Sequence, residues 1–341
     1  MKTISKILIF VSMSLALSGC DDFLTKEPET NLSPNTFFSS EAELELWTNR
    51  FYSLFAGPDT DAIQVSDIQI AKNLSSVQQG TRSPATENWG TSAWAYLRYI
   101  NYYLERSGNC SDETVRQRYD GVAYFFRALF YFEKVRKYGD IPYYDFVIPS
   151  NDWASLKRPR DSRGFVMKKV MEDLDRAITD LPDNWPSDAL YRLSKNAARA
   201  MKARAALYEG TFRKYHGIAE TIDGVTISAD YFLQLAADAA WAIMEQNKYS
   251  LYKGNTLKLD APYREYFILE DGDAKETILS MRAVEQGVVL STRGYAACGV
   301  SHPLKISAEQ GTTDRDSFVK MLSGCGGCNA AMLFKRGGMP C

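Results

Sequence analysis

Histidine is scarce in this chain of 341 residues, which contains only two. That scarcity leaves little for histidine catalysis or for a metal site built from several histidines. An excess of one charge is also lacking, because 40 lysines and arginines face 42 aspartates and glutamates. A net charge of −2 does not indicate a protein that binds nucleic acid through an overall positive charge. No Gly-x-Ser-x-Gly, His-Glu-x-x-His or phosphate-loop motif is present. We therefore expect no catalytic residues, no cofactor and no nucleic-acid partner.

Long apolar runs are missing except at the start of the chain. Lys2 and Lys6 precede the apolar run Ile7–Leu17, and Asp21 follows soon after it. A short basic segment and a short apolar core predict a secretory signal, and the run is too short to span a bilayer. The segment Leu-Ser-Gly-Cys20 resembles a bacterial lipobox. That resemblance implies cleavage before Cys20, with lipid attached to its sulfur as the membrane anchor.

Cysteines are few and unevenly placed, so they do not indicate a disulfide framework. Cys110 stands alone, and the other cysteines beyond Cys20 lie near the end of the chain. The spacing Cys325-Gly-Gly-Cys328 is that of a metal knuckle, and Cys298, Cys341 and His302 are enough to complete a zinc site. Structural zinc sites usually show two tight ligand pairs, and only one is present here. We expect no metal site.

What the sequence does contain is a series of amphipathic helices with serine caps. Ser40-Glu-Ala-Glu43 is typical of a capping box before the first helix. A second helix is expected from about 92 to 106, and a strongly apolar third over 113–138 must be covered on more than one side. Ser162, Ser194 and Ser228 each precede a further periodic segment. Strand signals are few, the best being 276–281, so the predicted fold class is all-α.

Several motifs occur in an order that resembles the SusD/RagB family of outer-membrane nutrient-binding lipoproteins. The lipobox Cys20-Asp-Asp-Phe-Leu comes first. The aromatic block 121–133 then leads through Tyr138 to the exit Gly139-Asp-Ile-Pro142. Later landmarks are Arg160-Asp-Ser162, Leu193-Ser-Lys-Asn-Ala-Ala198, Leu207-Tyr208, Tyr249-Ser-Leu251 and Glu276-Thr-Ile278. Each motif alone is weak evidence for the family, but their order over 20–285 is specific to it.

The resemblance implies both a fold and a role. The fold is a scaffold of four tetratricopeptide-like helix pairs carrying long irregular loops. The role is that of a cell-surface lipoprotein on the outer membrane of a Bacteroidetes-type bacterium. Such a protein binds nutrient oligosaccharides or polysaccharides and passes them to a SusC-like TonB-dependent transporter. Some relatives take peptides instead.

The resemblance ends near residue 285 and divides the chain into three parts. Residues 1–19 are the expected lipoprotein signal peptide, and 20–285 the SusD-like helical domain with its lipid tether. Residues 286–341 form a glycine-dense, cysteine-containing tail without periodicity, which we expect to be poorly ordered. Family members are considerably longer, so truncation, a frameshift or a divergent tail each fits. The alternatives to a binding lipoprotein are a nonfunctional truncated fragment, a peptide-binding relative and, last, a carbohydrate-active enzyme.

Tryptophans in loops are the best candidates for stacking on sugar rings. Trp89 follows a long polar loop, with Arg82 and Asn88 beside it, and Trp94 begins the next helix. These four residues are the predicted ligand-binding set. The other tryptophans are expected to be structural: Trp47 and Trp241 in the core, Trp153 and Trp185 covering helix ends. Asn101 is expected to make a buried structural hydrogen bond, and Arg127 to pair with a buried carboxylate.

Overall fold

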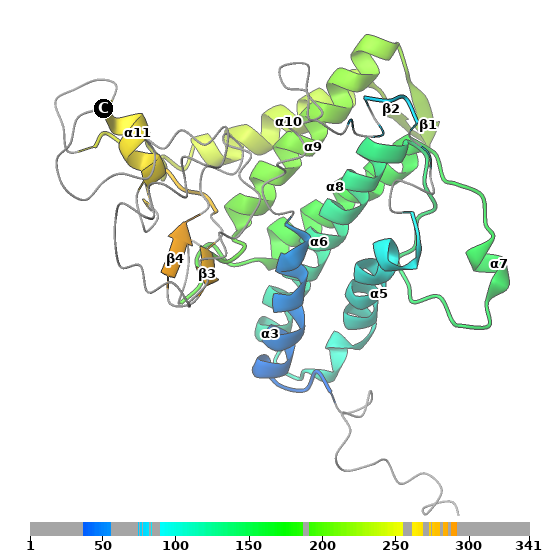
Figure 1. The fold of residues 1–341 in the computed structure, drawn as a ribbon, viewed down its shortest axis with the longest axis horizontal. Helices are drawn as coiled ribbons and strands as arrows, with labels where there is room; N and C mark the ends of the chain where they lie inside the picture. Colours follow the sequence, from blue (N-terminus) through cyan, green and yellow to red (C-terminus); the bar gives the residue numbers. More distant parts are fainter. Residues whose placement is uncertain are drawn as a thin grey trace, which may run out of the picture.

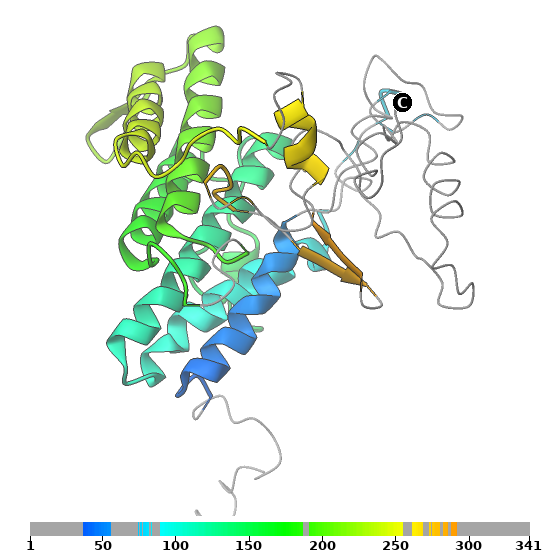
Figure 2. The ribbon, with the colours of Figure 1, turned by 90° about the vertical axis from the view of Figure 1, so that its left-hand side faces the viewer.

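The computed structural model describes residues 37–55, 74, 76, 78–81, 83, 89–186, 191–254, 261–268, 273, 275–279, 282–285 and 288–291. Within them the chain is mostly helical, as predicted. Five long helices lie side by side (Figure 1 and Figure 2): α5 (Thr91–Arg106), α6 (Glu113–Tyr138), α8 (Arg163–Asp180), α9 (Lys195–His216) and α10 (Ala229–Met244). In Figure 1 the short helix α7 (Trp153–Leu156) lies on the side opposite α11 (Ala261–Ile268), β3 (Arg282–Glu285) and β4 (Val288–Ser291). No helix in these residues is both long and apolar enough to cross a bilayer.

The first helix starts where the capping box predicts. Helix α3 (Glu41–Asn49) continues as the 3₁₀ segment η1 (Arg50–Leu54). The Oε2 of Glu43 accepts hydrogen bonds from the backbone amides of Ser39 (2.8 Å) and Ser40 (3.2 Å). Leu44 and Phe51 point into the core at helical spacing, and both are fully buried.

The third predicted helix is the central element of the bundle. Helix α6 (Glu113–Tyr138) contacts α3, α8 and α5 (Thr91–Arg106), which ends in the short 3₁₀ turn η2 (Ser107–Asn109). Thirteen residues of α6 are buried on several of its faces, which confirms that a helix this apolar must be covered on more than one side. Gly139 ends the helix with φ 74°, a conformation that glycine adopts without steric cost.

The three serine caps predicted for the second half all form. They begin α8 (Arg163–Asp180), α9 (Lys195–His216) and α10 (Ala229–Met244). In each case the serine Oγ accepts a hydrogen bond from the backbone N–H three residues later. The small residues of α9 let α10 approach closely: a Cβ built on Gly210 would lie 2.9 Å from the Leu233 side chain.

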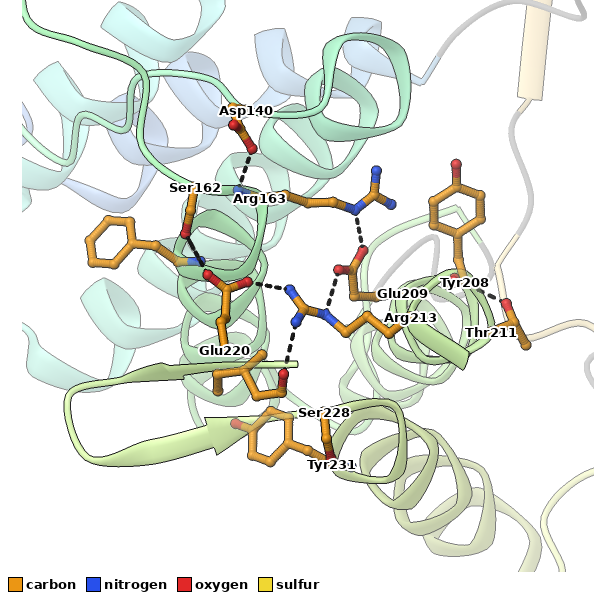
Figure 3. A network of polar contacts seen from close by, with 12 residues as sticks. Asp140, Ser162, Arg163, Tyr208, Glu209, Thr211, Arg213, Glu220, Ser228 and Tyr231 are labelled. Carbon is orange, nitrogen blue, oxygen red and sulfur yellow. Dashed lines mark hydrogen bonds and ion pairs between the residues drawn. The ribbon is translucent and has the colours of Figure 1, made fainter. Parts of the chain in front are cut away.

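A network of charged groups joins α8, α9 and a short hairpin at one end of the bundle (Figure 3). The buried Arg213 donates from Nε to Glu209 (2.9 Å), from Nη2 to Glu220 (2.7 Å) and from Nη1 to the Ile227 carbonyl (2.8 Å). Arg163 donates to the other oxygen of Glu209 at 2.8 Å. One guanidinium therefore holds both strands of the hairpin against the helices, at the end away from the turn.

That hairpin was missed in the sequence, although its turn carries a strong signal. Strands β1 (Glu220–Ile222) and β2 (Val225–Ile227) pair antiparallel around the two-residue turn Asp223-Gly224. Both turn residues have positive φ, 51° and 77°, as a type I′ turn requires and as Asp-Gly favours.

The predicted strand at 276–281 is wrong where the structure describes it. Residues 275–279 form a turn and bend, because Asp273 accepts hydrogen bonds from the amides of Lys275, Glu276 and Thr277. A strand begins later, at β3 (Arg282–Glu285), which pairs with β4 (Val288–Ser291). Two additional short helices are α7 (Trp153–Leu156) and α11 (Ala261–Ile268).

Two of the tryptophans predicted to be structural lie in exposed positions. Trp241 is 63% exposed because α10 packs its Phe232, Ala236 and Ala239 face inward and Trp241 lies on the other side of the helix. Trp153 begins α7 and is 65% exposed, so it covers no helix end. Trp47 packs against the core, as predicted, and Trp185 is buried.

Other predictions concern residues outside the described ranges. Cys20 and the signal segment lie there, as do Cys298, Cys325, Cys328, Cys341 and His302. Of the tail 286–341, only β4 is described. The lipid anchor, the tail and the absence of a metal site therefore stay predictions. Cys110 is described and is a buried free thiol.

Candidate ligand-binding site

A groove of about 640 Å³ lies between α5 and the segment 142–156. One wall carries Trp89, Trp94, Leu97 and Tyr99, and the other carries Tyr144 and Phe146. The remaining wall residues include Pro142, Val147, Ile148, Pro149, Ser150 and Leu156. We call this the aromatic groove. Its volume and its largely apolar, aromatic lining are typical of sites for small organic ligands.

The periodicity of α5 builds the first wall. Trp94, Leu97, Arg98 and Asn101 follow one another at spacings of three, one and three residues and therefore share one face of the helix. Gly90 occupies the N-cap position, and its lack of a side chain leaves the start of α5 without a side-chain cap at the groove. Backbone N–H groups at an uncapped helix start are donors that a ligand hydroxyl can use.

The second wall has little regular structure of its own, and side chains of α5 hold it in place. Asn101 Nδ2 donates to the carbonyls of Tyr144 (3.1 Å) and Phe146 (3.0 Å). Arg98 Nη1 donates to the Ile148 carbonyl at 2.9 Å. Glu105 Oε1 accepts from the Val147 amide at 2.6 Å. Three polar residues on one stripe of α5 thus fix the backbone of the opposite wall.

Asn101 also connects the groove to the core of the bundle. Its Oδ1 accepts a hydrogen bond from Arg127 Nη1 at 3.3 Å. Arg127 in turn forms a two-point ion pair with Asp173 on α8, at 2.7 and 2.6 Å. Asn101, Arg127 and Asp173 are all buried. The predicted roles of Asn101, a buried structural hydrogen bond, and of Arg127, a pair with a buried carboxylate, are confirmed.

Trp89 and Trp94 come together at the groove, in contact edge to face. Their ring centroids are 5.2 Å apart with an interplanar angle of 82°. Trp89 also packs against Tyr138 at 4.7 Å, and Trp94 against Phe130 at 5.6 Å. Both indoles are half-buried. Two of the four predicted ligand residues therefore share one site, whereas Arg82 and Asn88 lie outside the described residues.

The lining of the groove carries little charge, and three cations lie at or beside it. Arg98 is the single charged residue among the described lining residues. The Lys134 Nζ lies 5.5 Å from the Trp94 ring centroid, and the Arg160 guanidinium 5.3 Å from that of Trp89. Burial, together with the nearby charge of Lys137, lowers the pKa of Lys134. Burial raises the pKa of Tyr144, whose hydroxyl donates to the Ser155 carbonyl at 2.7 Å.

The arrangement is suited to binding a ring-shaped ligand. Indole and phenol faces can stack on the CH groups of a sugar ring, and the polar edge of α5 offers hydrogen-bond donors. Among the described residues there is no cluster of three or more His, Cys, Asp or Glu side chains that would hold a metal ion. The described lining contains no pair of carboxylates of the kind that glycoside hydrolysis uses.

Sequence reasoning found the tryptophan wall and missed the opposite one. Tyr144, Phe146 and the run Val147–Pro149 follow Pro142 in a segment without helical period. Several aromatic and apolar residues between two prolines, in an otherwise irregular stretch, were the available signal. Their partner Asn101 lies 43 residues before Tyr144, and a separation of that size carries no local sequence pattern.

Comparisons with known proteins agree on one family. The SusD-like family model described as "Starch-binding associating with outer membrane" matches residues 22–207. The chain is 28% identical over 226 residues to SusD-like protein P2 of Formosa agariphila, covering 61% of this chain and 44% of that protein. It is 23% identical over 230 residues to SusD-like protein P25 of the same organism, covering 60% and 43%.

Solved structures show the same fold. A SusD-like protein from Bacteroides fragilis superposes with a TM-score of 0.58 at 24% identity, over 76% of this chain and 48% of that one. A SusD homolog from Bacteroides thetaiotaomicron gives 0.53 at 16% identity, over 78% and 59%. A SusD-like carbohydrate-binding protein from B. fragilis gives 0.53 at 16%, over 75% and 52%. The chain spans about half the length of the relatives it matches.

Proposed function

We propose that this chain, which belongs to the SusD-like family, binds oligosaccharides in the aromatic groove and passes them to a SusC-like TonB-dependent transporter. The observation that carries the proposal is the meeting of Trp89 and Trp94 on one wall of a groove of about 640 Å³. Similar solved proteins are described as carbohydrate-binding, and the family model as associating with the outer membrane. Both descriptions support a nutrient-binding role.

The two indoles supply the stacking surface in this proposal. An aromatic contact is worth ~0.5–1.5 kcal/mol beyond the area it buries. Removing one ring therefore weakens binding roughly two- to tenfold, at 1.4 kcal/mol per decade. Trp89 also packs on Tyr138, so its removal lowers the melting temperature as well. Affinity and stability have to be measured side by side to separate the two effects.

The binding experiment uses the full chain and starts from a panel of neutral and acidic polysaccharides in affinity gels. Calorimetry with oligosaccharides of any polysaccharide that binds then compares Trp89→Ala and Trp94→Ala with the wild type. Trp241→Ala is the matched control, because Trp241 is exposed on α10 and is not among the groove residues. Unchanged affinity in folded Trp89→Ala and Trp94→Ala proteins would show that the groove does not bind the ligand. A peptide library in the same assay tests the peptide-binding alternative.

We propose that the chain is a lipoprotein with three parts: the signal peptide 1–19, the SusD-like domain 20–285 and the tail 286–341. Its anchor is the lipidated sulfur of Cys20, and it faces outward from the outer membrane. The motive is the basic start, the short apolar run and the lipobox-like exit. Labelled fatty acid should enter the wild-type chain and not Cys20→Ala. Equal labelling of the two would contradict the anchor.

Binding without turnover is the final part of the proposal. The groove presents aromatic rings and one arginine, and its described lining holds no carboxylate to serve as general acid or nucleophile. Any oligosaccharide that binds should be recovered unchanged after prolonged incubation. Release of shorter sugars by the purified chain, lost in Trp89→Ala, would favour an enzyme instead.

A further inference from the structure

Three cations lie at or beside the aromatic groove and pair with no carboxylate of the described residues: Arg98 lines the groove, and Lys134 and Arg160 lie over rings that line it. Arg98 is exposed, and its one hydrogen bond to a described residue goes to the Ile148 carbonyl. Lys134 is half-buried among the rings of Trp94, Phe130 and Tyr138, each 5.5–5.6 Å from its Nζ. Arg160 lies over Trp89. Among the described residues none of these three cations forms an ion pair.

Carboxylates near the groove are already engaged or lie outside its lining. Asp161 pairs with Arg158 at 2.8 Å, and Asp152 accepts hydrogen bonds from the amide (3.0 Å) and hydroxyl (2.6 Å) of Ser155. Glu105 accepts from the Val147 amide (2.6 Å) and pairs with Arg106 (3.2 Å). Asp145 is exposed next to Phe146 and, like Lys134 and Arg160, is not a lining residue. The described lining therefore carries one positive charge and no negative one.

This local excess differs from the charge balance of the chain. The sequence has more acidic than basic residues, 42 against 40. Buried cations of the bundle have carboxylate partners, as Arg127 has Asp173 and Arg213 has Glu209. A half-buried cation without such a partner has lost hydration that no protein anion replaces. An anionic ligand group beside Lys134 would supply that missing partner.

We propose that the aromatic groove selects acidic glycans, with the sugar rings on Trp89 and Trp94 and their anionic groups beside Arg98, Lys134 and Arg160. The inference rests on the proposed function of the same groove and names its substrate class. The shared chemistry is an anion on a sugar ring, either the carboxylate of a uronic acid or a sulfate ester. Both accept charge-assisted hydrogen bonds from guanidinium and ammonium groups.

The test compares acidic polysaccharides with their own uncharged derivatives, using the full chain. The probes are polygalacturonate, alginate and chondroitin sulfate, each beside its carboxyl-reduced form, with desulfated chondroitin added and with starch and xyloglucan as neutral references. Carboxyl reduction and desulfation remove the two anions separately, so they identify which one is recognised. We expect at least one acidic probe to bind at least tenfold more tightly than its neutral derivative. That preference should shrink as sodium chloride rises from 50 to 500 mM.

Variants assign the preference to the groove. Arg98→Gln removes the charge and keeps a donor for the Ile148 carbonyl, and it should cost about tenfold in affinity for the acidic probe. Arg98→Lys restores the charge and should recover most of that loss. Lys134→Met keeps the apolar stem against the rings and should cost a further few-fold. Arg176→Gln is the matched control, since Arg176 on α8 lies over Tyr124 of α6 and neither residue lines the groove.

The outcomes separate this inference from the proposed function. Equal affinity for acidic probes and their neutral derivatives, or binding of starch or xyloglucan alone, would overturn acidic selection and leave glycan binding in place. A preference that survives Arg98→Gln combined with Lys134→Met would also overturn it. Binding of no probe at all would overturn both proposals.

Discussion

The bundle core and the aromatic groove differ in whether their cationic side chains are paired with carboxylates. In the core, Arg127 and Arg213 are almost fully buried, and each is matched by carboxylates at hydrogen-bonding distance. At the groove, Arg98 and Arg160 are exposed and Lys134 is half-buried, and no described carboxylate pairs with them. A buried cation paired with a carboxylate of the protein stabilises the fold. A cation without such a pair, beside a groove, is available to bind an anionic ligand.

The largest expected effect comes from breaking the core pair on one side. Arg127→Leu leaves Asp173 buried without its partner, which costs about 3–5 kcal/mol in the free energy of unfolding. Chemical denaturation followed by circular dichroism measures the shift. The double variant with Asp173→Leu should recover much of the loss, because no unpaired charge remains. If Arg127→Leu is no less stable than the exposed-site control Arg204→Leu on α9, the pair does not hold the core together.

The elements that sequence reasoning predicted are those governed by local rules. Helix α6 follows from its own periodicity, and the starts of α8, α9 and α10 follow from serines that bond amides three residues away. The Arg127–Asp173 pair joins residues 46 positions apart, so the sequence predicted a buried partner for Arg127 without naming it.

The candidate site divides in the same way. Trp89 and Trp94 were found because tryptophans near a helix start after a polar loop form a local signal. The second wall depends on contacts from Asn101 to residues 43 and 45 positions away, which no pattern reveals. Trp241 was misplaced because helical periodicity predicts a buried face without showing how far around the helix it extends.

A somewhat smaller loss is expected at the second buried arginine. Arg213→Met removes three donors at once and leaves Glu209 with Arg163 alone, so the free energy of unfolding should fall by about 2–4 kcal/mol. Amide hydrogen exchange should speed up most in β1 and β2, because Arg213 holds both Glu220 and the Ile227 carbonyl. Unchanged exchange in the hairpin would contradict this role.

Asp120 on α6 is half-buried, and its raised pKa predicts a pH dependence. Burial raises its pKa to about 6, and its Oδ1 has no hydrogen-bond partner in the described structure. The folded state therefore holds a proton between about pH 4 and 6 that the unfolded state has released. Stability from this group falls as pH rises through that window.

Asp120→Asn tests that sign. The substitution should stabilise the chain by about 1–2 kcal/mol at pH 7 and by much less near pH 4, where the folded-state carboxyl is protonated and the unfolded state has released only about half of its proton. Melting temperatures measured from pH 4 to 7 should converge for the two proteins at the acid end. A larger gain in stability for Asp120→Asn at pH 4 than at pH 7 would contradict the raised pKa of Asp120.

The smallest predicted effect is the loss of one helix cap. Ser194→Ala removes the acceptor for the Ala197 amide, 3.3 Å away, and should cost about 1 kcal/mol. Ser92→Ala on α5 is the control, because Ser92 is exposed, and it should stay within about 0.5 kcal/mol of the wild type. Equal losses in the two variants would show that the cap itself contributes nothing.

The central claim is that the aromatic groove is where ligand binds, and the indole N–H signals of the six tryptophans test it most directly. Each signal can be assigned by a single Trp→Phe variant and followed by NMR as a glycan selected from the affinity gels is added. The account predicts that the Trp89 and Trp94 signals move together at saturable concentrations, while that of the exposed Trp241 stays in place. Movement of Trp241 or another tryptophan, with Trp89 and Trp94 unchanged, would contradict it.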